Sequence, residues 1–340
     1  MTGCDDPEAQ ESSESPGAPE APGVPFLIGS TASGKSALAL RLCEVFEAEL
    51  LSLDSMQVYR GMDIGTAKPT LEEQARLRHH LIDLVEPHER YDVQRFVRDF
   101  RAARDDCRGR GVRAIAVGGT GLYLQALLRG MFDGPPPDMA LRDALKARVR
   151  DEGLATLVDE LARVDPESAA RIHPNDEKRV LRALEVHHQT GRAMSDWQRE
   201  WKAVPRPQAK VVGLSRPVPE LDRRIRARTE EMLDAGWVEE ARAVRDGAGF
   251  GPTAVQALGY REVLALADGE LARPAASEAI ALATRQFARR QRTWFRRFEA
   301  FWVRLEEASA TSQSDCDPLE LGGMSHEKWA AQLGWNDPCS

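Results

Sequence analysis

Short apolar runs alternate with amphipathic stretches over most of the chain. The first run, residues 26–28, stops at Gly29, and apolar side chains then recur at helical spacing as far as Phe46. Further runs of strand length cover residues 49–53, 112–117, 209–214 and 301–303. Short buried strands that alternate with helices are typical of a parallel sheet with helical crossovers. The pattern therefore predicts an α/β fold in which helices flank a parallel sheet.

Between two groups of prolines the pattern changes to helix alone. Three prolines at 135–137 precede residues 138–201, where apolar residues recur almost only at helical spacing, and Pro205 and Pro207 follow. Prolines in such positions mark hinges between compact segments. We therefore expect an all-helical insertion domain at residues 138–204, within an α/β core formed by residues 25–137 and 205–304.

Both ends of the chain are acidic and weakly patterned. Residues 1–24 carry six acidic side chains and no basic one, and residues 305–340 carry seven acidic side chains and one lysine. Of the formal net charge of −8, these ends contribute −6 each, which leaves +4 for residues 25–304. This composition predicts a disordered acidic leader at 1–24 and a flexible acidic tail at 305–340. The mildly basic remainder permits a nucleic-acid partner without requiring one.

The composition fits a cytoplasmic protein. No run approaches the roughly 18 apolar residues of a membrane span, and the N-terminus lacks the basic and apolar pattern of a signal peptide. The five cysteines are scattered, without a CxxC pair and without a zinc-like grouping with histidines. We therefore expect a monomer in the reducing cytoplasm, with no membrane contact and no obligate protein partner.

The segment after the first apolar run carries a specific phosphate-binding motif. Residues 29–36 match the pattern GxxxxGK[ST] between a predicted strand and a predicted helix. In this setting backbone N–H groups converge on a polyphosphate, while Lys35 neutralises the terminal phosphate and Ser36 holds Mg²⁺. The predicted phosphate site consists of Gly29, Ser30, Thr31, Ala32, Ser33, Gly34, Lys35 and Ser36. The motif does not specify which phosphate compound binds there.

An aspartate ends the second predicted strand. Asp54 directly follows residues 49–53, and in doubly wound sheets the carboxyl ends of the strands form the ligand-binding edge. At that edge Asp54 either holds Mg²⁺ through water or accepts a proton from an incoming nucleophile. A solvated turn aspartate is the alternative, but the neighbouring phosphate motif favours a functional role.

Several further blocks of sequence follow the phosphate motif. They are DSMQVYRGMDIGTAKP at 54–69, HHLID at 79–83, VGGTGLY at 117–123, RIHPND at 171–176, RALE at 182–185, GYRE at 259–262 and TRQ at 284–286. In order and spacing they resemble the tRNA dimethylallyltransferase (tRNA isopentenyltransferase) family of bacterial type, over about residues 25–304. Ser30 departs from that family, which usually has proline there, and the change alters the stiffness of the loop.

The resemblance implies a prenyl transfer and a P-loop NTPase-like fold. In the family, the exocyclic N6 amine of the adenosine immediately 3′ of the anticodon attacks C1 of dimethylallyl pyrophosphate, in tRNAs that read codons beginning with U. N6-dimethylallyladenosine and pyrophosphate are the products. The implied partners are the tRNA anticodon stem-loop and dimethylallyl pyrophosphate, with Mg²⁺ as cofactor. Catalysis then has to stabilise charge on the leaving pyrophosphate and orient a weakly nucleophilic amine.

The resemblance also implies roles for individual residues. Lys35, Asp54 and Thr120 would be catalytic, with Asp54 taking the proton of the amine. Arg228, with Arg224 one turn away on a predicted helix, would contact the pyrophosphate. Residues implied to contact tRNA are Asp54, Ser55, Met56, Gln57, Thr120, Arg142, Lys178, Arg179, Val180, Leu181, Arg182, Gln256, Ala257, Leu258, Gly259, Tyr260 and Arg261. A plain helix N-cap is the alternative for Thr120, and a solvated helix face is the alternative for the two arginines.

Residues 285–297 mix basic and aromatic side chains. Six arginines lie among Phe287, Trp294 and Phe295, a combination that suits phosphate neutralisation together with base stacking. An amphipathic core helix with a charged outer face is the alternative, and both interpretations are compatible on one helix.

Other functions share the phosphate motif. A kinase would use ATP at the same loop, but the helical insertion and the basic–aromatic stretch count against it. A prenyltransferase of free adenine nucleotides would not need the basic block at 178–182. An RNA-binding NTPase switch leaves the block at 54–69 unexplained. Phosphoryl transfer from ATP without any use of a prenyl donor would favour the kinase.

Overall fold

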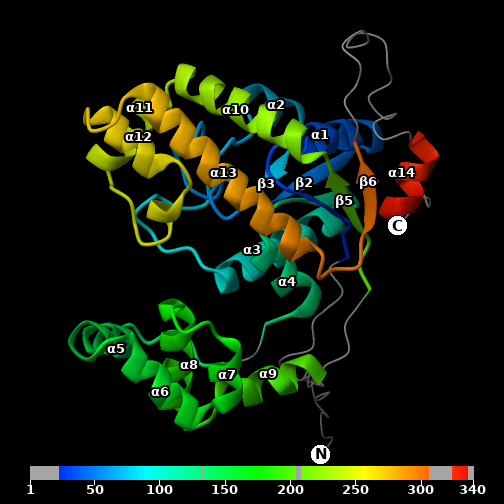
Figure 1. Ribbon diagram of the computed structural model, residues 1–340. Helices are drawn as coiled ribbons and strands as arrows, with labels where there is room; N and C mark the ends of the chain where they lie inside the picture. The colour runs from blue at the N-terminus through cyan, green and yellow to red at the C-terminus, as the bar shows by residue number, and fades with distance from the viewer. Residues whose placement is uncertain (1–22, 132–133, 204–207, 306–323, 336–340) are drawn as a thin grey trace, which may run out of the picture. The chain divides into compact units, whose positions relative to one another are not determined.

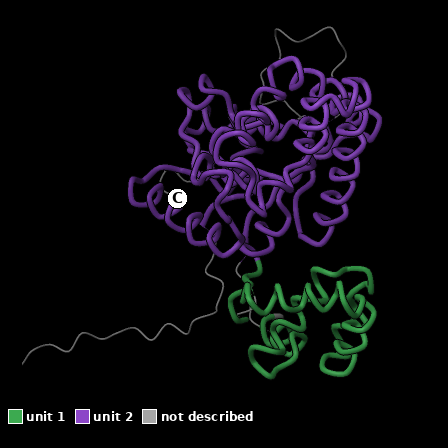
Figure 2. The backbone as a smooth tube through the Cα atoms, turned by 90° about the vertical axis from the view of Figure 1, so that its left-hand side faces the viewer, with its two compact units in different colours: residues 1–20, 129–207 green, residues 21–128, 208–340 purple. Residues whose placement is uncertain are grey.

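The computed structural model describes residues 23–131, 134–203, 208–305 and 324–335, which form two compact units (Figures 1 and 2). Of these, residues 23–128, 208–305 and 324–335 belong to the larger unit, and residues 129–131 and 134–203 belong to the smaller. The predicted leader lies outside the described residues, apart from its last two. Within the described residues, every helix is too short or too polar to cross a lipid bilayer.

A six-stranded parallel sheet forms the centre of the larger unit (Figure 1). In spatial order the strands are β3 (His79–His80), β2 (Ala48–Leu53), β4 (Arg113–Gly118), β1 (Phe26–Gly29), β5 (Val211–Ser215) and β6 (Phe301–Arg304). Every neighbouring pair is parallel, so all carboxyl ends lie along one edge. The five predicted strands are confirmed to within two residues. The two-residue β3 was missed because its histidines give no apolar signal.

Helices cover both faces of the sheet. On one face Phe26 and Ile28 of β1 lie in an apolar cluster with residues of six helices, which are α3 (Val93–Gly109), α4 (Gly121–Arg129), α10 (Val218–Asp234), α11 (Trp237–Asp246), α12 (Tyr260–Ala267) and α13 (Arg273–Phe295). On the other face Leu27 lies in a cluster with α1 (Lys35–Phe46) and α14 (His326–Leu333). Because successive strand residues point to opposite faces, a sheet covered on both sides needs the continuous apolar runs seen in the sequence.

Two further elements complete the larger unit. They are α2 (Leu71–Arg76) and the short 3₁₀ helix η1 (Ala254–Gln256). Helix α10 lies along α13 (Figure 1), and Ile225 of α10 packs with Ala281 and Ala288 of α13. Helix α10 carries Arg224 and Arg228, and α13 carries Gln291, all of which contact the site described below.

Helix α14 corrects the expectation of a flexible tail from residue 305 onward. Trp329 is fully buried, and Leu333 and Trp335 belong to the same apolar cluster. The Trp335 ring centroid lies 5.1 Å from that of Phe46 in α1. Apolar residues at helical spacing therefore outweigh the acidic composition of this part of the tail. Residues 306–323 and 336–340 lie outside the described residues.

The smaller unit is helical throughout its regular structure. Its helices are α5 (Met139–Glu152), α6 (Leu154–Val164), α7 (Pro166–Arg171), α8 (Glu177–Thr190) and α9 (Met194–Ala203). They share one apolar core, which includes Leu157, Leu161 and Leu184. Buried Asp165 caps α7 through the amide of Ser168, 2.9 Å away, and accepts a second hydrogen bond from the amide of Ser195 at 2.9 Å. One carboxylate thus fixes the starts of α7 and α9.

The smaller unit begins before the predicted insertion boundary at residue 138. The buried carboxylate of Glu185 in α8 accepts a hydrogen bond from the Asp138 amide at 2.7 Å, and Arg182 donates to the Pro135 carbonyl at 2.6 Å. These bonds attach the proline-rich segment to α8, so the unit reaches back to Arg129.

Candidate active site

The carboxyl ends of three neighbouring strands bring the predicted catalytic residues to one edge of the sheet. Strand β4 lies between β2 and β1, and Gly118 is in register with both Leu53 and Ile28. Asp54 follows β2, Thr120 follows β4, and the phosphate loop (residues 29–36) follows β1. The turn that carries Thr120 therefore lies between Asp54 and the phosphate loop, although the three are far apart in sequence.

The phosphate loop folds tightly against the start of α1. A Cβ atom on Gly29 would lie 2.6 Å from the Ser33 hydroxyl, so only glycine fits there. Gly34 has a φ of +94°, a left-handed conformation that glycine adopts without strain. No side chain of the described residues caps α1. Its first N–H groups are thereby left for an anionic ligand.

Three arginines surround the loop. Arg224 and Arg228 lie one turn apart on α10, and both reach the loop, as their spacing predicts. Arg224 donates to the Ala32 carbonyl at 2.9 Å, and Arg228 donates to the Thr31 hydroxyl. Arg216, which the sequence interpretation missed, donates to the Ser33 carbonyl at 2.9 Å.

Burial of the positive charges shapes the electrostatics of this loop. Burial lowers the pKa of both Arg224 and Arg228. Burial likewise lowers the pKa of Lys35 to about 8; nearby Asp54 opposes this shift and Arg228 adds to it. The Lys35 ammonium donates to the Ser30 carbonyl, 3.4 Å away. Cations held this close together gain stability from a multiply charged anion between them.

Asp54 and Thr120 are connected through the segment after β2. The Asp54 carboxylate accepts a hydrogen bond from the Met56 amide at 2.8 Å, which forms a tight turn. The Thr120 hydroxyl accepts from the Ser55 amide at 3.1 Å, and the Thr120 amide donates to the Leu53 carbonyl at 3.1 Å. Thr120 therefore joins the ends of β2 and β4, which goes beyond the helix N-cap considered as its alternative.

The side chain of Gln57, predicted to contact tRNA, is used within the protein. Its carboxamide accepts from the Ser52 hydroxyl at 2.9 Å and donates to the carbonyls of Thr66 at 3.3 Å and Ala67 at 3.0 Å. These bonds hold both ends of the signature segment (residues 54–69) together. Through these hydrogen bonds Gln57 helps to fix the position of the backbone next to Asp54.

A buried lysine stabilises the middle of the signature segment. The side chain of Lys68 is only 1% exposed. Its ammonium donates to the Tyr59 carbonyl at 2.7 Å and pairs with the carboxylates of Asp83, at 2.6 Å, and Asp63. Two anionic partners and one carbonyl compensate for the burial of the charge.

Glu240 of α11 holds the same segment from outside it. Its carboxylate accepts hydrogen bonds from three successive amides, those of Asp63 at 2.7 Å, Ile64 at 2.6 Å and Gly65 at 3.0 Å. The Tyr260 hydroxyl donates to it as well, at 2.6 Å. Tyr260, predicted to contact tRNA, is itself buried, and its hydroxyl is used within the protein.

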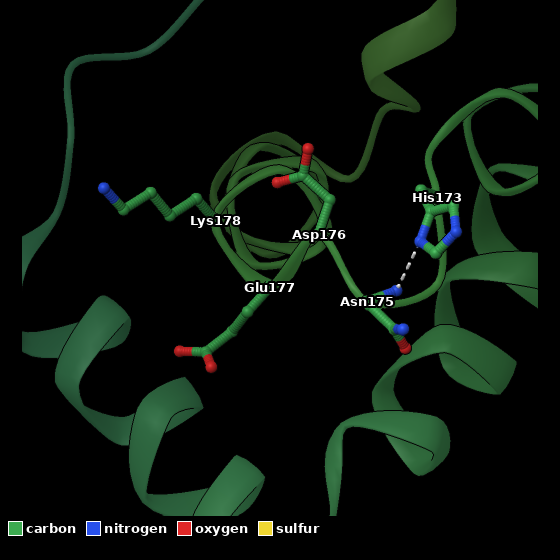
Figure 3. Close-up of a pocket in the computed structure, with 5 residues that line it drawn as sticks. All are labelled: His173, Asn175, Asp176, Glu177 and Lys178. Carbon is green, nitrogen blue, oxygen red and sulfur yellow. Dashed lines mark hydrogen bonds between the residues drawn. The ribbon is translucent and has the colours of Figure 1, made fainter. Parts of the chain in front are cut away.

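In the smaller unit, an open pocket lies at the start of α8 (Figure 3). Its lining consists of His173, Asn175, Asp176, Glu177 and Lys178. The Asn175 amide donates to Nδ1 of His173 at 3.2 Å, and Asp176 caps α8 through the Arg179 amide at 3.2 Å. The Lys178 and Glu177 side chains extend from the helix in different directions (Figure 3). The pocket thus offers both signs of charge at the surface.

The remaining predicted tRNA contacts divide into exposed and buried side chains. Arg179 and Arg261 are exposed, their side chains 65% and 90% accessible. Val180 and Leu181 are buried in the helical core, and Ala257 is buried in the larger unit. The side chains of these three residues take part in apolar packing.

Arg142 and Arg182, also predicted to contact tRNA, share one buried anion. Both guanidinium groups pair with the fully buried Glu185, at 2.6 Å and 3.0 Å, and keep about a quarter of their side chains exposed. Glu185 therefore places the two arginines side by side on α5 and α8.

A second charged cluster lies at the β3 edge of the sheet. Its members are Glu49, His80, Asp106 and Cys107, whose possible ligand atoms lie within 4.8 Å of one another. This grouping was not predicted, because its members come from three separate segments of the sequence. Arg110 donates to both carboxylates, at 2.7 Å to Glu49 and 2.9 Å to Asp106. Its hydrogen bonds hold the pKa of Glu49 down to about 2. The guanidinium supplies the cation that balances this cluster.

Comparison with known proteins shows to which family the chain belongs. The sequence model of the family described as IPP transferase matches residues 57–298. The chain belongs to the IPP transferase family. Within it, a tRNA dimethylallyltransferase of Trichlorobacter lovleyi is 45% identical over 296 residues, which cover 86% of this chain and 97% of that protein. A tRNA dimethylallyltransferase of Sorangium cellulosum is 45% identical over 291 residues, which cover 85% and 92%.

Solved structures agree with the IPP transferase assignment. The tRNA isopentenylpyrophosphate transferase of Bacillus halodurans superposes with a TM-score of 0.62 at 33% identity, covering 91% of this chain and 96% of that one. A eukaryotic dimethylallyltransferase described as acting on tRNA gives a TM-score of 0.70 at 29% identity, covering 83% and 73%. The P-loop-like parallel sheet is therefore the fold of this family.

Three residues of the site lie outside what the IPP transferase resemblance supplied. Arg216 and Glu240 give no local signal, because their partners are distant in sequence. Gln291 does give one, since Thr284, Ala288, Gln291 and Phe295 form the buried face of α13. A polar residue at a buried helical position is a signal that the sequence interpretation passed over.

Proposed function

We propose that this chain transfers the dimethylallyl group of dimethylallyl pyrophosphate to the N6 amine of the adenosine immediately 3′ of the anticodon, in tRNAs that read codons beginning with U. Membership of the IPP transferase family and relatives named tRNA dimethylallyltransferase support the reaction. The observation that carries the proposal is the meeting of the phosphate loop, Asp54 and Thr120 at one edge of the sheet.

The residues at this edge suit the bond changes of prenyl transfer. The C1–O bond of the donor breaks and its electron pair stays on the pyrophosphate, where Lys35, Arg224 and Arg228 stabilise the charge. The N6 lone pair forms the new C–N bond, and Asp54 accepts the amine proton. Thr120 lies between the two centres and orients the reacting groups through its hydroxyl.

A divalent cation fits the start of α1. Ser36 is exposed in the first turn of the helix, and hydroxyl and phosphate oxygens are ligands that Mg²⁺ prefers. Bound there by Ser36, Mg²⁺ would neutralise part of the pyrophosphate charge.

The tRNA requires a second, basic surface, which we assign to the smaller unit. Arg142, Lys178, Arg179 and Arg182 lie on α5 and α8, where they would neutralise backbone phosphates of the anticodon stem-loop. The adenine must leave its stack to reach the reaction centre. In the larger unit, Arg297, just after the end of α13, lies over the Trp294 ring, 4.6 Å from its centroid.

The substrate also indicates where and how the enzyme works. A tRNA substrate places the reaction in the cytoplasm, away from membranes. The family reaction needs no second protein, and we propose that a monomer carries it out. The gel-filtration mass of the purified protein, with and without tRNA, tests this assignment.

Prenyl incorporation tests the proposed function directly. The purified protein is incubated with labelled dimethylallyl pyrophosphate, Mg²⁺ and unmodified tRNA, and the tRNA is then digested to nucleosides. We expect N6-dimethylallyladenosine with an equal amount of released pyrophosphate. A matched tRNA with guanosine 3′ of the anticodon serves as the control and should remain unlabelled.

The same assay separates the alternatives. Phosphoryl transfer from ATP without prenyl incorporation would identify a kinase. Labelling of free adenine nucleotides but not of tRNA would identify a nucleotide prenyltransferase. Either result contradicts the proposal.

A further inference from the structure

One buried carboxamide joins the two loops that flank the reaction centre. Gln291 of α13 is only 6% exposed. Its Oε1 accepts a hydrogen bond from the Thr31 amide at 2.8 Å, and its Nε2 donates to the Gly119 carbonyl at 2.9 Å. The side chain therefore connects the phosphate loop to the turn that carries Thr120.

The fit around this carboxamide is close. A Cβ atom on Gly119 would lie 2.2 Å from Nε2 of Gln291, so glycine is required for the contact. Ala32 of the phosphate loop packs against the apolar cluster that α10 and α13 form through Ile225, Ala281 and Ala288. The carboxamide of Gln291 reaches past the loop to the turn after the next strand.

The bond to Thr31 also fixes what the loop presents. In a phosphate loop, backbone N–H groups point at the anion, but the Thr31 amide is already committed to Gln291. On its other side Thr31 receives the Arg228 guanidinium on its hydroxyl. Thr31 is therefore held from two helices, α10 and α13.

We propose that Gln291 is a positioning residue for prenyl transfer, which sets the spacing between the phosphate loop and Thr120. This inference rests on the proposed function. A leaving group held by the loop and an amine oriented near Thr120 react only at a defined separation. The planar carboxamide of Gln291 bonds to both loops. It therefore keeps this separation whether or not substrate is bound. It acts through its neighbours and touches neither substrate.

Replacement by a side chain of similar size tests the role. Gln291→Met keeps the volume and removes both hydrogen bonds. We expect kcat/KM for dimethylallyl pyrophosphate to fall about 100-fold, while KM for tRNA stays within twofold. Gln94→Met makes the same chemical change at an exposed position of α3 and should leave activity unchanged.

Hydrogen exchange provides a readout that does not depend on activity. The Thr31 amide should exchange slowly in the wild type and measurably faster in Gln291→Met, because its acceptor is lost. An amide of the sheet core, such as that of Leu51, should be unaffected. Equal exchange at Thr31 in both proteins would show that the bond does not form.

A charged variant gives a pH signature. In Gln291→Glu the protonated carboxyl can donate to the Gly119 carbonyl as the amide does, whereas the carboxylate repels it. Burial raises the pKa of such a carboxyl, so the activity relative to wild type should recover as the pH falls toward 5. This variant also keeps the proposal testable if Gln291→Met does not fold.

The outcomes separate this inference from the function on which it rests. An active wild type with a Gln291→Met variant of equal kcat/KM would overturn the positioning role alone. So would a loss of activity confined to KM for tRNA, or a Gln291→Glu ratio that does not change with pH. A wild type without prenyl transfer would instead refute the proposed function.

Discussion

At the scale of single residues, the buried positive charge of Lys35 destabilises the folded protein. The pKa of Lys35 falls from 10.5 to about 8 because of burial. Below pH 8 both the folded and the unfolded chain are protonated, and the folded state carries the full penalty. Between about pH 8 and 10.5 the unfolded chain binds more protons than the folded one, so this group makes the free energy of unfolding rise with pH.

Lys35→Met should therefore stabilise the ligand-free protein while it abolishes donor binding. We expect a higher melting temperature than wild type at pH 7 and a smaller difference above pH 10. Differential scanning calorimetry measures the first effect, and titration calorimetry with dimethylallyl pyrophosphate measures the second. A variant that melts lower at pH 7, or that still binds the donor, would contradict the assignment of Lys35.

The proposed role of Asp54 as the base leads to a second prediction at this scale. Asp54→Asn keeps the oxygen that accepts from the Met56 amide but cannot take a proton from the amine. General-base catalysis contributes about 10²- to 10⁴-fold, so the single-turnover rate should fall within that range. The Kd for tRNA, measured by filter binding, should change by less than about threefold. Turnover close to that of the wild type would remove Asp54 from its role.

At the scale of elements, Glu240 shows how one helix shapes a distant loop. Glu240→Ala leaves the amides of Asp63, Ile64 and Gly65 without their acceptor. Each unsatisfied, partly buried donor costs about 1 kcal/mol or more, so the free energy of unfolding should fall by about 3 kcal/mol. Urea denaturation provides the measurement.

A neighbouring acid on α11 is the control for this prediction. Glu239 is exposed, and Glu239→Ala should change the free energy of unfolding by less than about 0.5 kcal/mol. If the two variants lose the same stability, the loss comes from helix charge and not from the loop amides.

The elements also show how much of the fold and of the site could be predicted from the sequence. Continuous apolar runs located five strands because both sheet faces are covered, and the phosphate motif located Lys35 because its function is local. Arg216 and Glu240 were missed because the loop residues that they bond lie at least 170 positions away in sequence. Gln291 was missed although it is a polar residue on the buried face of a predicted helix. Helix α14 was not predicted because the acidic composition was given more weight than Trp329, Leu333 and Trp335, which pack in the cluster with Leu27 and Phe46.

At the scale of the whole molecule, α14 closes one face of the sheet. Trp329 is fully buried in the cluster that also contains Leu27 and Phe46. Truncation of a buried tryptophan costs about 3–5 kcal/mol, so Trp329→Ala should lower the free energy of unfolding by about that amount. Glu327 is exposed on the same helix, and Glu327→Ala is the control, which should change the free energy of unfolding by less than about 0.5 kcal/mol.

The effect on catalysis should be much smaller than the effect on stability. Helix α14 packs on the sheet face that carries α1. Helix α13, whose Gln291 bonds to both active-site loops, packs on the other face. Well below its melting temperature, Trp329→Ala should therefore keep kcat and both KM values within about threefold of wild type. A large fall in kcat with folding intact would mean that the α14 face transmits strain through α1 to Lys35, since α1 begins at that residue.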